Sequence, residues 1–118
     1  MLDRVESAPT ASVADLPSTG LALLDVREPE EWAAGHAPEA VHIPLGELPA
    51  RAAELAELPD DQPVYVVCRG GGRSAHAAAW LNAAGIVEAV NVAGGMKSWE
   101  TEGRPLVGER YGAPPEVL

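Results

Sequence analysis

The sequence predicts one α/β domain with a largely parallel sheet. Short apolar runs alternate along the chain with stretches of helical periodicity, which is typical of parallel strands joined by crossover helices. The chain has 118 residues, enough for one hydrophobic core and too few for two. We therefore expect a single domain over residues 1–118, with a core over about 10–106 and an irregular tail at 107–118.

Four segments have the composition of buried strands. Residues 21–26 follow turn residues, and residues 63–67 are rich in β-branched side chains. Residues 40–43 end at Pro44, and residues 89–92 precede a pair of glycines. In parallel sheets of this kind, ligands bind beyond the carboxyl ends of the strands. We therefore look for functional side chains directly after these segments.

Four segments between and after these strands have the pattern of helices. Residues 28–34 end at a glycine, residues 48–58 carry leucines on one face, and residues 96–102 end before Gly103. The clearest helix is predicted over 74–84, where small and apolar residues share one face before Gly85. Large aromatic side chains on such helices usually pack inward. We expect core positions for Trp32, Trp80 and Trp99.

Composition excludes several classes of function. The formal net charge of −10 argues against nucleic acid as a partner, because phosphate binding needs a basic face. No apolar run approaches the ~18 residues of a membrane span, and the first residues lack the apolar core of a signal peptide. We therefore expect a cytoplasmic protein. With three histidines and one cysteine, we expect no metal site and no cofactor.

Cys68, the only cysteine, directly follows the predicted strand 63–67 and precedes Arg69, three glycines, Arg73 and Ser74. Glycines can turn successive amides toward an anion, and the following helix directs its positive end toward the same place. Two arginines add positive charge. These effects should lower the pKa of Cys68 and make it a nucleophile. The alternative is a small buried side chain that closes a strand.

Three motifs of the chain resemble those of the rhodanese family of sulfurtransferases. Residues 68–74 are similar to its active-site loop, residues 24–44 to its N-terminal signature, and residues 91–105 to its C-terminal signature. Glu39 departs from the pattern, because a glycine is usual there. The resemblance covers about residues 20–106. It implies a rhodanese-like three-layer sandwich, in which helices flank a five-stranded, mainly parallel sheet.

The resemblance also implies a mechanism. Cys68 would take the outer sulfur of a donor such as thiosulfate, hold it as a persulfide, and pass it to a thiophilic acceptor such as cyanide or a thiol. The partners would then be a small-molecule sulfur donor, this acceptor and, in some settings, an acceptor protein. The residues that would hold the donor are Arg69, Gly70, Gly71, Gly72, Arg73, Ser74 and, with lower priority, Arg27.

Two of these residues have structural roles as alternatives to donor binding. Ser74 can cap the helix, which is the stronger expectation, or donate to a bound anion. Arg27 can contact the donor or form a structural ion pair, for example with Glu31 one helical turn away.

Other functions stay open at this stage. A sulfur-relay or protein-interaction module with weak turnover would share the same motifs. Related phosphatases and arsenate reductases have a loop one residue longer than the six residues from Cys68 to Arg73, so we rank them lower. An ATP-binding loop is a poor match, because the required lysine is absent.

Overall fold

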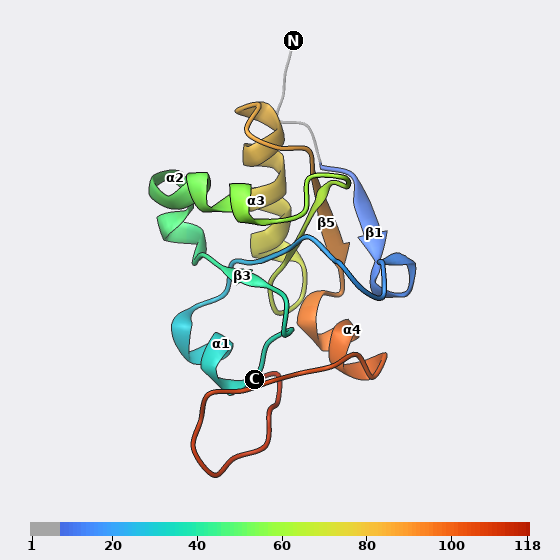
Figure 1. Ribbon diagram of the computed structural model, residues 1–118, viewed down its shortest axis with the longest axis vertical. Helices are drawn as coiled ribbons and strands as arrows, with labels where there is room; N and C mark the ends of the chain where they lie inside the picture. The colour runs from blue at the N-terminus through green and yellow to red at the C-terminus, as the bar shows by residue number, and fades with distance from the viewer. Residues whose placement is uncertain (1–7) are drawn as a thin grey trace.

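A computed structural model describes residues 8–118 and shows an α/β sandwich (Figure 1). Its sheet has five strands in the order β1-β5-β4-β2-β3, and every pairing is parallel. The predicted fold class is therefore confirmed. The strands are β1 (Thr10–Ser12), β2 (Leu23–Asp25), β3 (Val41–His42), β4 (Val64–Val67) and β5 (Ala89–Ala93).

The edge strand β1 was not among the four strand segments predicted from the sequence. It is three residues long and pairs with β5 from Thr10↔Asn91 to Ser12↔Ala93. Only Ala11 of β1 is partly buried, so the segment lacks the apolar run that marks the inner strands. Its pairing comes from the main chain, which a sequence pattern does not display.

The helices cover both faces of the sheet (Figure 1). The α-helices are α1 (Pro29–Ala34), α2 (Leu48–Arg51), α3 (Gly72–Ala83) and α4 (Gly95–Thr101). Three short 3-10 helices are interspersed: η1 (Val13–Asp15), η2 (Leu45–Glu47) and η3 (Ala52–Glu57).

The helix predicted over 48–58 is divided. It is α-helical only to Arg51 and continues as the 3-10 helix η3. A 3-10 helix has three residues per turn, so Leu55 and Leu58, three positions apart, both reach the core. Leu55 lies within η3 and Leu58 is its C-cap residue, so the core contacts of this segment extend to the end of the predicted helix.

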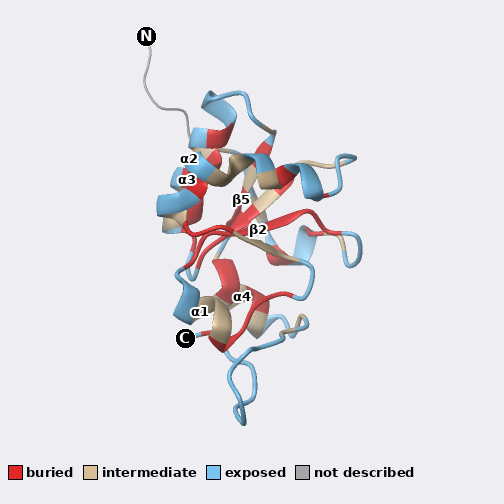
Figure 2. Cartoon of the chain, turned by 60° about the vertical axis from the view of Figure 1, so that its left-hand side comes forward, coloured by how far each residue is buried: buried red, intermediate tan, exposed pale blue. Residues whose placement is uncertain are grey.

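Each face of the sheet has its own hydrophobic core. One contains Leu24, Val66 and Leu81 of α3, and the other contains Leu23, Val67 and Trp99 of α4. Neighbouring strand residues enter opposite cores because side chains alternate across a sheet. Figure 2 shows β2 in the colour of buried residues, near the centre of the molecule. The rigid centre of this sandwich fixes the carboxyl ends of β2, β4 and β5.

The predicted burial of the tryptophans holds for one of the three. Trp99 is 1% exposed, whereas Trp32 is half-buried and Trp80 is 38% exposed. The inner face of α3 is built from Ala77, Ala78 and Leu81. Trp80 is not on this buried face of the helix.

The segment 107–118 is irregular and mostly exposed, but residues near its two ends contact the domain; we call it the C-terminal strap. Val107 forms an antiparallel bridge with His36, and the Glu116 amide donates to the Ala34 carbonyl over 2.9 Å. Val117 is buried in the same core as Trp99. The strap therefore connects α1 with α4. Among residues 8–118, no helix combines the length and apolar character needed to cross a membrane.

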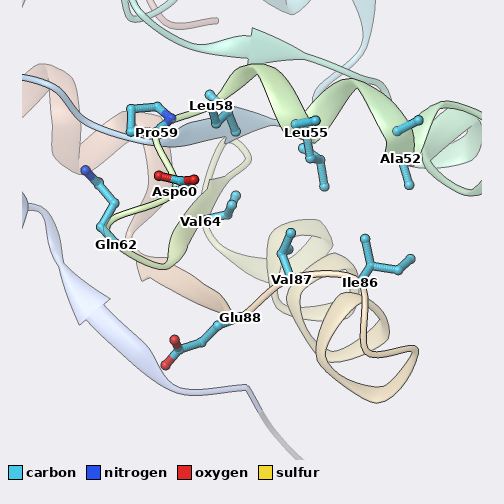
Figure 3. Close-up of a pocket in the computed structure, with 12 residues that line it drawn as sticks. Ala52, Leu55, Leu58, Pro59, Asp60, Gln62, Val64, Ile86, Val87 and Glu88 are labelled. Atoms are coloured by element: carbon cyan, nitrogen blue, oxygen red, sulfur yellow. The ribbon is translucent and has the colours of Figure 1, made fainter.

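A surface pocket of about 560 Å³ lies beside η3 and the loop before β5 (Figure 3). Leu55 and Val87 form part of its apolar wall, and Asp60 and Glu88 lie among its polar residues. Val64, also in the wall, begins β4, whereas Cys68 follows the end of that strand. The pocket and the thiol therefore lie at opposite ends of the strand.

Candidate active site

The main chain around Cys68 is held by the first turn of α4. The Met96 amide donates to the Cys68 carbonyl over 2.8 Å, and the Lys97 amide donates to the Arg69 carbonyl over 3.1 Å. In a trans peptide unit the N–H points away from the C=O. The amides that follow these carbonyls therefore point away from α4, and one of them, the Gly70 amide, interacts with the Cys68 side chain.

Gly95 makes this close approach possible. Its φ is +54°, and a Cβ atom there would overlap the main-chain oxygens of Cys68 and Arg69. An L side chain is disfavoured on both grounds. Gly95 was part of the sequence motif but was not predicted to shape the loop.

The sulfur of Cys68 accepts hydrogen bonds from the loop that follows it. The Gly71 amide lies 3.0 Å from Sγ, and Ser74 Oγ lies 3.3 Å from it. Burial acts to raise the pKa of Cys68, but hydrogen bonds from Ser74, Gly71 and Gly70 outweigh it, so the pKa is lowered. This agrees with the predicted direction. The leading favourable causes are hydrogen bonds rather than the charges of the two loop arginines.

Of the three loop glycines, only Gly71 needs its special conformation. Its φ is +114°, and it is the N-cap of α3. A Cβ atom at Gly70 or Gly72 would meet nothing within 4 Å. Their absent side chains leave open space on the exposed side of the loop, so they are suited to admitting a substrate rather than to bending the chain.

Ser74 does not cap α3, which corrects the stronger sequence expectation. The helix begins at Gly72, two residues before Ser74, and has no side-chain cap. Ser74 is instead buried, with Oγ 2.6 Å from Oδ1 of Asn91 on β5. Its single proton can go to only one acceptor at a time. Asn91 therefore shares control of the hydroxyl that contacts the sulfur.

The two loop arginines already have partners. Arg73 donates to both carboxylate oxygens of Glu31 on α1, over 2.8 and 3.0 Å. Arg69 is exposed and donates from Nε to the main-chain oxygen of Leu118 over 2.6 Å. The loop thus contacts both α1 and the C-terminal strap through its arginines.

Arg27 is fully buried and belongs to a structural ion pair. Its Nη2 lies 2.7 Å from Asp25 Oδ2 and donates to the Gly35 carbonyl over 2.8 Å. Among the described residues, its Nη1 has no hydrogen-bond partner. The sequence suggested Glu31 as its ion-pair partner, but Glu31 binds Arg73 instead. Asp25 takes that place because its side chain lies beside the Arg27 amide at the end of β2.

A stack of aromatic rings supports the segment around Arg27. The Trp32 ring is parallel to those of His36 and His42, with centroids 3.5 and 4.6 Å away. A His42 ring nitrogen lies 2.8 Å from the Arg27 carbonyl. Trp32 therefore has a packing role on the site's flank, although it is outside the main core.

A family model for the rhodanese-like domain matches residues 10–102. The chain belongs to this family. The match includes the loop that follows Cys68, and the described strands and helices lie mostly within it.

Relatives of this rhodanese-like chain include named sulfurtransferases. One from Allochromatium vinosum is 38% identical over 72% of this chain and 77% of its own length. A thiosulfate sulfurtransferase from Pseudomonas syringae is 33% identical over 79% of this chain and 85% of its own length. The crystal structure of a rhodanese-related protein from Thermoplasma volcanium has a TM-score of 0.72, with 36% identity over 84% of this chain and 97% of that one.

Another relative is named for a proposed sulfur-carrier role. This Bacillus subtilis protein is 44% identical over 67% of the present chain, and the match spans only 41% of its own length. Together, the relatives support sulfur transfer of the rhodanese type.

Sequence reasoning missed two polar residues of this rhodanese site. Asn91 is the only polar residue of β5, whose other members are alanine and valine, and that isolation was an available signal. Glu31 was considered only as a partner of Arg27. Its contact with Arg73 joins residues 42 positions apart, so only the three-dimensional fold reveals it.

Proposed function

We propose that the protein is a sulfurtransferase in which Cys68 carries the sulfur as a persulfide. The thiolate attacks the outer sulfur of a donor such as thiosulfate; the S–S bond of the donor breaks, and sulfite leaves with the electron pair. An acceptor such as cyanide or a thiol then attacks the outer sulfur and regenerates the thiolate. The observation that carries this proposal is the hydrogen-bonded sulfur of Cys68 with its lowered pKa.

The loop suits the intermediate as well as the nucleophile. Amides that donate to a thiolate can donate equally to the outer, negatively charged sulfur of a persulfide. Gly70 and Gly72 are exposed and have no side chain to obstruct that sulfur. Arg69 and Arg73 supply positive charge at the rim, and Arg27 supports the site from beneath. Donor contact by these arginines stays a prediction.

Mass spectrometry of the intact protein tests the proposal. After incubation with thiosulfate, we expect an added mass of one sulfur atom, which cyanide should remove. Cys68→Ala should gain nothing under the same conditions. A wild-type protein that neither thiosulfate nor an organic persulfide modifies, or an equal adduct on Cys68→Ala, would overturn the proposal.

A sulfur-relay module is the second candidate, and the sulfur-carrier relative favours it. A relay module would transfer the Cys68 sulfur slowly to cyanide and rapidly to the thiol of a partner protein. Hydrolysis of aryl phosphates or reduction of arsenate, without formation of a persulfide, would instead favour a phosphatase or an arsenate reductase. The cytoplasmic location and the lack of a metal or cofactor stay predictions.

A further inference from the structure

The positive charges expected to attract an anionic donor are largely neutralised within the protein. Arg27 is paired with Asp25, and Arg73 is paired with Glu31 through two hydrogen bonds. Arg69 alone has no carboxylate side chain as a partner among residues 8–118. A Cys68 thiolate would cancel that remaining charge. The immediate surroundings of the reactive sulfur are therefore close to neutral before any donor arrives.

Glu31 is held firmly in the position that neutralises Arg73. Its Oε1 also accepts the Glu28 amide over 2.9 Å, as part of the capping box of α1. Its side chain is only 16% exposed. Charge-assisted hydrogen bonds from main-chain and guanidinium donors are strong, so they keep this carboxylate in place. The fold therefore fixes the Glu31–Arg73 ion pair, unlike a contact between two mobile surface side chains.

Arg73 also lies within electrostatic reach of the reactive sulfur. The hydrogen bond that Arg73 donates to Glu31 is the leading cause of its raised pKa, and the charges of Cys68 and Glu28 contribute further. The Arg73 guanidinium therefore interacts with the charge of Glu31 and with that of the Cys68 thiolate. A donor anion that approaches the sulfur would meet a positive group whose charge Glu31 already balances.

We propose that Glu31 determines donor specificity by holding Arg73, so that Cys68 takes sulfur from donors with little negative charge, organic persulfides above all, in preference to thiosulfate. This inference rests on the proposed sulfur transfer through Cys68. Thiosulfate brings two negative charges beside the Glu31 carboxylate, and Coulomb repulsion grows with each charge. A persulfide RSSH reacts with less repulsion: the thiolate bonds to its outer sulfur, the S–S bond breaks, and RS⁻ leaves with the electron pair.

The test uses donors that differ in charge and share the same reaction. Rates of persulfide formation on Cys68 are measured with thiosulfate, with the singly charged methanethiosulfonate anion, and with cysteine persulfide. Each rate is divided by that of a small free thiol, which removes differences in intrinsic reactivity. We expect wild-type protein to disfavour thiosulfate on this scale.

Glu31→Gln is the informative variant. Glutamine can still close the capping box, but it carries no charge, so we expect kcat/KM for thiosulfate to rise about tenfold. The rate with cysteine persulfide should stay within about twofold. The matched control is Glu30→Gln, which removes the same charge from an exposed neighbour on α1. Within the described structure, Arg73 pairs with Glu31 and not with Glu30.

The outcomes separate this inference from the proposed function. If Glu31→Gln changes all donors alike, or leaves thiosulfate unchanged, Glu31 does not set specificity while sulfur transfer stands. If the control matches Glu31→Gln, the effect is general charge and the inference is wrong. If no donor adds sulfur to wild-type Cys68, the proposed function itself fails.

Discussion

Hydrogen bonds tune the Cys68 thiol more than charge does. The sulfur is nearly buried, which by itself favours the neutral thiol, yet donors from the loop reverse that preference. Ser74 is the only side-chain donor among them. The sequence alone predicted the direction in which the pKa of Cys68 is shifted. It could not assign Ser74 to the sulfur, because that depends on where α3 begins and on Asn91 across the sheet.

Ser74→Ala should raise the pKa of Cys68, because it removes a hydrogen bond to the thiolate. In wild-type protein, alkylation by iodoacetamide should titrate below the ordinary cysteine value of about 8.5. In the variant, the midpoint should move to higher pH, so the rate at neutral pH falls while the rates converge at alkaline pH.

Ser12→Ala serves as the control, since the Ser12 hydroxyl is exposed and bonds to Asp15. Its alkylation profile should match that of the wild type. A Ser74→Ala profile with an unchanged midpoint would show that the loop amides alone lower the pKa.

Two neighbouring helices position the loop that follows Cys68. Helix α4 binds its carbonyls, and helix α1 binds Arg73 through Glu31. Most elements could be predicted from the sequence, because apolar runs and helical periodicity mark the inner strands and the longer helices. The edge strand β1 and the division at Arg51 could not. The strand β1 is defined by its main-chain pairing with β5. The change of helix type after Arg51 accompanies the burial of Leu55 and Leu58.

Gly95→Ala should loosen the contact between α4 and the loop. The new Cβ would overlap the oxygens of Cys68 and Arg69, at a main-chain conformation that alanine disfavours. We expect a loss of about 2–4 kcal/mol in the free energy of unfolding, measured by urea denaturation. Sulfur transfer should fall further than stability explains, since the displaced carbonyls carry the sulfur-binding amides with them.

Gly70→Ala is the comparison within the same loop. A Cβ there meets nothing within 4 Å, so stability should stay within about 0.5 kcal/mol of wild type. Equal stability of the two variants would mean that α4 does not fix the loop.

At the scale of the whole molecule, the C-terminal strap joins parts that are distant in sequence. It pairs with His36, binds the end of α1, and buries Val117 against the core that contains Trp99. The Val117 amide also donates to Glu100 of α4 over 3.1 Å. The irregular backbone of residues 107–118 was expected from their composition. Their contacts with α1, α4 and the core were not expected, because a single buried valine leaves no periodic pattern in the sequence.

Two valines of the strap provide a matched test of its contribution to stability. Val117 is 5% exposed and Val107 is 40% exposed, so alanine at each removes the same atoms from different surroundings. Val117→Ala should lower the free energy of unfolding by about 1–2 kcal/mol, through lost burial and the cavity left behind. Val107→Ala should cost less than about 0.5 kcal/mol, because its bridge to His36 is made by the main chain. Urea denaturation of both variants measures the difference, and equal midpoints would show that the strap does not share the stability of the sheet.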